Sequence, residues 1–115
     1  MVEVAEKYRK LGVPLDGIIQ DWRYWGEDNS SWNAIQFLNP NFSRPQEMFS
    51  SLRKMNVKMM ISVWPSFGNG TEIFKELDKK GALYPMVSSP REARVYDAFN
   101  PEARGICLLY TSPSP

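Results

Sequence analysis

The chain has 115 residues, of which 43% are apolar, and its 14 basic and 13 acidic side chains leave a net charge of +1. This length and composition indicate one globular domain rather than a disordered chain. The balanced charge lacks the basic cluster typical of nucleic-acid binding. No apolar stretch approaches the ~20 residues that span a bilayer. We therefore expect neither a nucleic acid nor a membrane as a partner.

Two residue types restrict the chemistry that the chain can carry. Histidine is absent, which excludes histidine acid–base catalysis and histidine metal ligation. Cys107 is the single cysteine, so no internal disulfide can form. Any catalysis would depend on Asp, Glu, Lys or Tyr, and we expect no cofactor and no metal site.

The first part of the chain reads as a helix followed by a strand. Val4, Tyr8 and Leu11 recur at helical spacing, and Gly12 ends the predicted helix over residues 2–11. The next apolar run predicts a strand over residues 15–22. Residues 26–45 are rich in Asp, Asn, Ser and Pro, and they predict a long loop of the kind that often carries function.

A second helix and strand follow this loop. Pro45 favours a helix start, and the predicted helix ends near Asn56. The mostly apolar residues 57–64 predict a strand. The methionines of this region are interpreted as core residues, because methionine fills irregular gaps; they are Met48, Met55, Met59 and Met60.

The pattern then repeats. Thr71 is expected to cap a third helix that ends at Gly81, residues 95–99 predict a third short strand, and Asn100-Pro101-Glu102 opens another helix. Alternating helices and strands indicate an α/β fold with parallel strands. Because an eight-unit barrel needs ~250 residues, this chain would be a partial (β/α)8 TIM barrel of about three βα units. A thin doubly wound sheet is the alternative, but its usual glycine-rich turn is absent after the first strand.

The segment GIIQDWRYWG, residues 17–26, carries the clearest functional signal. A short apolar run leads into Asp21, and Trp22, Tyr24 and Trp25 follow at once. Function gathers where parallel strands end. A carboxylate accepts hydrogen bonds from sugar hydroxyls, and aromatic rings cover the apolar faces of a pyranose. The alternative is that the rings fill the core and Asp21 caps a turn.

Several separate motifs resemble glycoside hydrolase family 31, in particular its bacterial α-xylosidase-like members. They are YRKLGVPLDGIIQDWRYWG, the later Trp32, the helix with Met48, KMMISVWP and YDAFNPEAR. The resemblance covers residues 2–104. It implies a (β/α)8 barrel that cleaves α-glycosides with retention, using one aspartate as nucleophile and a second as acid/base.

The resemblance implies roles for matching positions only. Asp21 matches an aspartate that hydrogen-bonds the sugar in the −1 subsite, Trp22 matches the adjacent wall, and Trp64 matches an aromatic residue lining the same pocket. Tyr24, Trp25 and Trp32 fall in the loop over the site. Asp97 lies at the end of a later strand, and its plainer role is to hold a turn or to cap the helix that begins at Asn100.

The resemblance also implies an internal fragment, because the nucleophile and the acid/base belong to later segments. We therefore predict a barrel fragment over residues 1–105. Residues 106–115, ICLLYTSPSP, break the pattern of the expected helix. They are interpreted as a non-native or disordered tail.

Two classes of function follow. The first is a fragment of a retaining α-glycosidase, an α-xylosidase or α-glucosidase, that contributes subsite walls to an oligosaccharide or glycoside substrate. The second is a non-catalytic carbohydrate-binding module with a tryptophan platform formed by Trp22, Trp25 and Trp64. The alternation of helices and strands is unusual for such a module.

Overall fold

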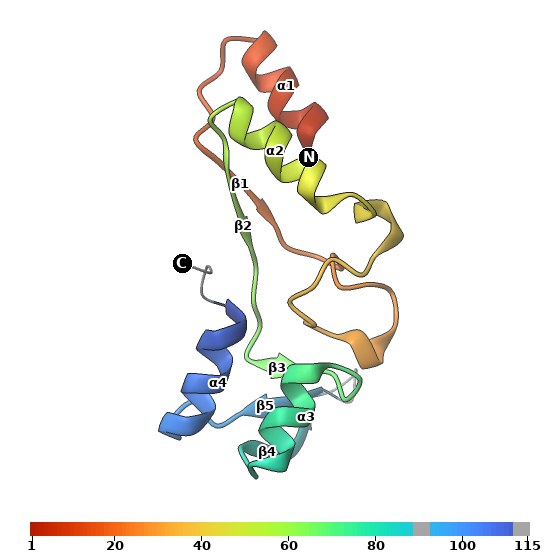
Figure 1. Cartoon of the computed structure of the whole chain (residues 1–115), viewed down its shortest axis with the longest axis vertical. Helices are drawn as coiled ribbons and strands as arrows, with labels where there is room; N and C mark the ends of the chain where they lie inside the picture. The colour runs from red at the N-terminus through yellow and green to blue at the C-terminus, as the bar shows by residue number, and fades with distance from the viewer. Residues whose placement is uncertain (89–92, 112–115) are drawn as a thin grey trace.

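The computed structural model describes residues 1–88 and 93–111. The molecule is elongated, with extents of 50 × 29 × 21 Å. Helices α1 and α2 lie at one end, and α3, α4 and a small sheet lie at the other (Figure 1). The strands β1 and β2 run between the two ends. None of the helices in the described part of the chain is long and apolar enough to cross a membrane.

Two helix–strand units form the first half of the fold. Helix α1 spans Val2–Lys10 and precedes strand β1, Gly17–Gln20; helix α2 spans Pro45–Lys54 and precedes strand β2, Lys58–Ile61. The two strands pair in parallel, with Ile18 opposite Met59 and Ile19 opposite Met60. This order confirms the first two predicted helices and strands, although both strands are shorter than predicted.

The two faces of this parallel pair have different environments. Ile18 and Met59 pack on a cluster formed with α1 and α2, whose buried members are Ala5, Leu52 and Val57. Ile19 and Met60 lie on the other face and are 60% and 56% exposed. Met60 is therefore not a core residue, because residues alternate between the faces of a strand. The other predicted core methionines, Met48, Met55 and Met59, do pack on the cluster.

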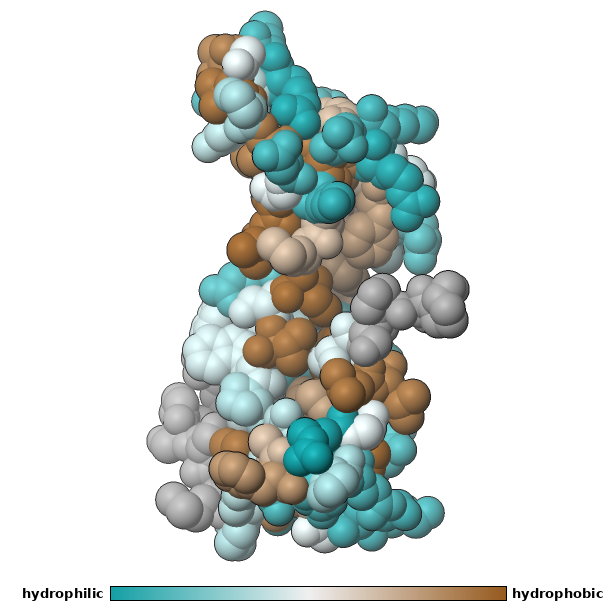
Figure 2. All heavy atoms as spheres, turned by 90° about the vertical axis from the view of Figure 1, so that its left-hand side faces the viewer, coloured by the Kyte–Doolittle hydropathy of each residue, from teal (hydrophilic) through white to brown (hydrophobic). Residues whose placement is uncertain are grey.

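The outer edges of β1 and β2 pair with no other strand among the described residues. The described residues consequently form no closed barrel. A hollow of about 810 Å³ lies beside α2 and β2, and its lining includes Phe49, Arg53 and Met60. On the side of the molecule shown in Figure 2, hydrophobic side chains run down the middle of the surface.

Three of the helices end in the same way. Gly12, Asn56 and Gly81 each have a positive φ, between 53° and 69°, two residues after the last residue of α1, α2 and α3. Glycine and asparagine adopt this left-handed conformation most readily, and it closes a helix by returning backbone N–H groups to the last carbonyls. After α2, for example, Val57 N–H donates to Leu52 O at 2.9 Å. The predicted helix ends at these three residues are confirmed.

The second half of the fold contains a small antiparallel sheet. Its strands are β3, Ser66–Phe67, β4, Leu83–Ser88, and β5, Ala93–Tyr96, in the order β3-β5-β4. The predicted third strand exists as β5, but the expectation that it is parallel is wrong. Strands β3 and β4 were not predicted, because β3 has only two residues and β4 contains Pro85 and a register shift.

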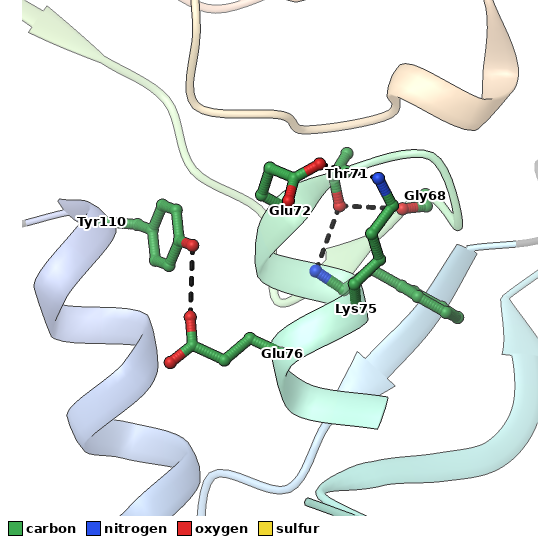
Figure 3. Close-up of polar contacts among 7 residues, drawn as sticks. Gly68, Thr71, Glu72, Lys75, Glu76 and Tyr110 are labelled. Carbon is green, nitrogen blue, oxygen red and sulfur yellow. Dashed lines mark hydrogen bonds and ion pairs between the residues drawn. The ribbon is translucent and has the colours of Figure 1, made fainter. Parts of the chain in front are cut away.

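Helix α3, Glu72–Lys79, and helix α4, Pro101–Thr111, pack against this sheet. The side chain of Thr71 caps α3 as predicted: its Oγ1 accepts from Phe74 N–H at 3.2 Å and donates to Gly68 O at 2.8 Å (Figure 3). The Tyr110 hydroxyl donates to Glu76 Oε2 at 3.1 Å and joins α4 to α3 (Figure 3).

The course of α4 corrects one expectation. The helix continues through residues 106–111, and Ile106 is buried in a cluster with Phe67 and Leu77. The prolines that were expected to end the helix are residues 113 and 115, beyond Thr111. The prediction of a disordered tail is thus wrong for residues 106–111. Residues 112–115 lie outside the described residues. The non-native origin of the segment stays a prediction.

Candidate functional site

Asp21 is the first residue after β1, and the segment 62–64 follows β2. Because β1 and β2 are parallel, these residues lie at the same edge of the sheet. Asp21 is exposed, and its carboxylate forms no hydrogen bond or ion pair with any residue in the described part of the chain. Its oxygens are therefore open to solvent at the edge where parallel strands present functional side chains.

Four tryptophans form a connected cluster beside Asp21, and Trp32 is at its centre. The ring of Trp32 lies 5.5 Å from that of Trp22, 5.5 Å from that of Trp64 and 5.0 Å from that of Trp25, between centroids. Trp25 and Trp32 are buried, whereas Trp22 and Trp64 are 43% and 41% exposed. Two exposed indoles are thus held on a buried aromatic base in edge-to-face or tilted contacts.

Tyr24 links the loop after β1 to the end of β2. Its side chain is fully buried, and its hydroxyl donates to Ser62 O at 3.0 Å. Burial, together with the smaller effect of the negative charge of Asp21, raises the pKa of Tyr24 to about 12. The tyrosine therefore stays protonated and keeps this hydrogen bond throughout the neutral range.

Burial corrects the interpretation of two predicted site residues. Tyr24 and Trp25 were expected to contact sugar, but their rings are 0% and 1% exposed and offer a ligand no surface. The loop of residues 26–45 folds over them: Leu38 N–H and Asn39 N–H both donate to Tyr24 O, at 3.0 and 3.1 Å. Tyr24 and Trp25 therefore support the exposed rings.

That loop is ordered by two short 3-10 helices, η1 (Asn29–Ser31) and η2 (Pro40–Phe42). Asp28 precedes η1, and its side chain accepts from Ser30 N–H; Asn39 precedes η2, and its side chain accepts from Asn41 N–H at 2.9 Å. Hydrogen bonds from Ser30 lower the pKa of Asp28. The predicted long loop is real, and capped turns hold it in place.

Asn33 is a site residue that sequence reasoning missed. Its side chain is fully buried, and its Nδ2 donates to Trp64 O at 2.6 Å and to Ser66 O at 3.0 Å. Its Oδ1 accepts from Trp64 N–H at 3.2 Å. The neighbouring Trp32 donates from Nε1 to Ser66 Oγ at 3.1 Å. A lone asparagine in a polar loop gives no periodic signal, so the sequence pattern could not identify it.

Arg23 and Asp97 both have local partners. Arg23 forms an ion pair with Glu27, and its guanidinium lies 5.7 Å from the centre of the Trp22 ring. The Asp97 carboxylate accepts from Phe99 N–H at 3.0 Å and from the Tyr84 hydroxyl at 3.2 Å. Asp97 therefore holds a turn, which is the plainer of its two expected roles.

The arrangement can bind a polyhydroxylated ligand, because one carboxylate lies at the same strand edge as two exposed indoles. Residues 20–22 and 62–64 contain a single carboxylate, Asp21. Retaining glycoside hydrolysis needs a pair of carboxyl groups. Within the ranges 1–88 and 93–111, no three Asp, Glu, Cys or His side chains gather in a way that could hold a metal ion.

Comparison with known proteins identifies the family. The model of the glycosyl hydrolases family 31 TIM-barrel domain matches residues 1–109. An α-xylosidase of Saccharolobus solfataricus is 42% identical over 83 residues, which cover 72% of this chain and 11% of the relative. An uncharacterized family 31 glucosidase of Pseudescherichia vulneris is 27% identical over 114 residues, 90% of this chain and 20% of the relative.

Solved structures agree with this result. A family 31 α-xylosidase from Xanthomonas citri superimposes with a TM-score of 0.81 at 28% identity, over 95% of this chain and 13% of that one. A family 31 α-xylosidase from a soil metagenome, solved with xylose, gives a TM-score of 0.78 at 25% identity, over 95% of this chain and 17% of that one. These matches confirm the predicted partial barrel.

The chain spans between 11% and 20% of the length of the two curated relatives. Every named match is a glycosidase, and nothing in the comparisons favours the non-catalytic module. Because the family model covers residues 1–109, this chain belongs to glycoside hydrolase family 31, as part of its TIM-barrel domain.

Proposed function

We propose that this chain is part of the barrel of a retaining α-glycosidase that hydrolyses α-xylosides, with α-glucosides as the second substrate class. Its residues Asp21, Trp22 and Trp64 bind the sugar at the −1 subsite. The observation that carries the proposal is the unpartnered, exposed carboxylate of Asp21 at the strand edge that also carries the two exposed indoles. The α-xylosidases among the similar proteins support the choice of sugar.

The chemistry of the three side chains is complementary. The carboxylate of Asp21 accepts charge-assisted hydrogen bonds from sugar hydroxyls, which are about twice as strong as neutral ones. In retaining glycosidases such bonds strengthen as the ring flattens toward the oxocarbenium-like transition state. The indoles of Trp22 and Trp64 cover the apolar faces of the ring and exclude water.

The bond-breaking pair lies outside this chain in the proposal. A retaining mechanism places two carboxyl groups ~5–5.5 Å apart, one attacking the anomeric carbon and one moving the proton. Asp21 does neither: it holds the sugar in the distorted geometry on which that pair acts. The isolated chain is accordingly expected to hydrolyse no aryl α-xyloside and no aryl α-glucoside.

The test is Asp21→Ala in the complete protein that contains this chain. We expect kcat/KM for an aryl α-xyloside to fall by roughly 10²–10⁴, equivalent to ~3–5.5 kcal/mol of transition-state binding, with little change in melting temperature. Asp16→Ala is the matched control, because Asp16 is an exposed carboxylate just before the other end of β1. It should leave kcat/KM near the wild-type value.

The opposite pattern would assign Asp21 a purely structural role. A cap residue would cost ~1 kcal/mol of stability and leave the kinetics intact. A lowered melting temperature with near wild-type kcat/KM therefore contradicts the proposal.

A further inference from the structure

We infer that Asn33 is a positioning residue that sets the place of Trp64 at the sugar-binding edge. Asn33 itself is fully buried, so it acts through Trp64 and does not contact a ligand. The consequence for catalysis rests on the proposed function above. The consequence for the conformation of Trp64 does not, and the two can be measured separately.

The contacts are specific to the peptide groups that carry Trp64. Asn33 accepts from the backbone N–H of Trp64 at 3.2 Å and donates to its carbonyl at 2.6 Å. The same Nδ2 also donates to Ser66 O at 3.0 Å. The side chain of Asn33 thus engages three backbone groups: the N–H and C=O of Trp64, between β2 and β3, and the C=O of Ser66, the first residue of β3.

The backbone of Asn33 imposes a second requirement. Its φ is 57°, in the left-handed region that side chains other than glycine, asparagine and aspartate rarely adopt. Asparagine meets both demands, because it tolerates this conformation and its amide carries a donor and an acceptor. Glycine meets only the backbone requirement, because it has no side-chain amide. Aspartate tolerates the backbone, but when ionised it offers no donor to the two carbonyls.

The residue before Asn33 extends the link to the other side of the site. The Trp32 ring contacts both Trp22 and Trp64, each at 5.5 Å between ring centroids. Trp32 O accepts from Gly68 N–H at 2.9 Å, and Trp32 Nε1 donates to Ser66 Oγ at 3.1 Å. The dipeptide Trp32-Asn33 therefore holds both exposed indoles through one loop, and Asn33 fixes the backbone from which Trp64 projects.

The experiment uses 5-fluorotryptophan in the complete protein and follows fluorine NMR, with the Trp64 signal assigned by Trp64→Phe. Asn33→Asp and Asn33→Gly should each shift or broaden the Trp64 signal. With an aryl α-xyloside, KM should rise about 10-fold while kcat changes less than about 3-fold, because a wall residue binds ground and transition states alike.

Asn39→Asp is the matched control. Asn39 is a second buried asparagine of the same loop, and its side chain bonds backbone groups of Arg23 and Asn41. It has no hydrogen bond to Trp64 among the described residues. The control should lower the melting temperature to a similar extent and leave the Trp64 signal and KM unchanged.

Each outcome decides the proposal. An unchanged Trp64 signal in a folded Asn33→Asp or Asn33→Gly protein overturns it. So does failure of both variants to fold when Asn39→Asp folds, since Asn33 would then serve the whole fold. If the wild-type protein cleaves no α-glycoside, the proposed function fails, and the fluorine signal still decides whether Asn33 positions Trp64.

Discussion

The Tyr24 hydroxyl donates to the backbone carbonyl of Ser62 at 3.0 Å, so the loop after β1 is fastened to the end of β2. Tyr24→Phe removes the donor and leaves a carbonyl beside a buried ring. We expect the free energy of unfolding at pH 7 to fall by about 1–3 kcal/mol, as for a buried hydrogen bond left half satisfied. Urea unfolding of wild type and variant measures the difference; equal midpoints would contradict it.

The same residue predicts a dependence on alkaline pH. The pKa of Tyr24 is raised from 10.0 to about 12 in the folded protein by burial and by the Asp21 charge. As pH rises, the unfolded chain therefore loses the Tyr24 proton before the folded protein does. The contribution of Tyr24 to the free energy of unfolding is fully present below pH 10 and is lost as pH rises toward 12. The stability difference between wild type and Tyr24→Phe should be constant below pH 10 and shrink above it.

Gly68 should tolerate no side chain. A Cβ there would lie 2.7 Å from Asn29 O and closer still to Ser30 O, both of them backbone atoms. Gly68→Ala should therefore cost about 1–3 kcal/mol and loosen the loop that carries Trp32. Gly105→Ala is the control, because a Cβ at this helical glycine meets nothing within 4 Å and should stabilise α4 by about 0.5–1 kcal/mol. Thermal unfolding followed by circular dichroism distinguishes the two.

Residues 106–111 should contribute to stability only through the face of α4 that is buried. Ile106 is 6% exposed and Leu109 is 78% exposed on the same helix. Ile106→Ala should cost about 2–5 kcal/mol, whereas Leu109→Ala should stay within about 0.5 kcal/mol of wild type. If both substitutions prove neutral, the helix does not pack as described beyond Gly105.

Three of the four tryptophans should separate into binding and supporting roles. In the complete protein, Trp22→Ala and Trp64→Ala should raise KM for an aryl α-xyloside with modest effects on melting temperature, since both rings are about 40% exposed. Trp25→Ala should lower stability by about 3–5 kcal/mol, because the ring is 1% exposed. Kinetics and melting curves of the three variants test this division, and a KM change confined to Trp25→Ala would contradict it.

Local sequence signals predicted the parts of the fold that depend on local physics. Gly12, Asn56 and Gly81 end helices because few other residues adopt a left-handed conformation, and Thr71 caps α3 with its own side chain. The position of Asp21 at the end of β1 also followed from the apolar run before it. Such features need only the nearest neighbours in the chain.

The remainder depends on contacts between distant residues. Nothing in the sequence near Tyr24 and Trp25 shows that residues 37–39 fold over them, so the two rings were assigned to the surface. Strand β3 has two residues and exists because Ser66 and Phe67 pair with β5. Asn33 is buried because it meets residues 64–66, about thirty positions further along the chain.

The buried hydrophobic residues of the described chain are divided among three clusters that share no member. One lies with α1 and α2, one around Trp32, and one between α3 and α4. Regions that bury separate surfaces open with separate free energies. The hydrogen-exchange rates of amide protons in α1 and in α3 should accordingly depend differently on denaturant concentration. The loop that holds the tryptophans would then be the boundary between two units of cooperative unfolding.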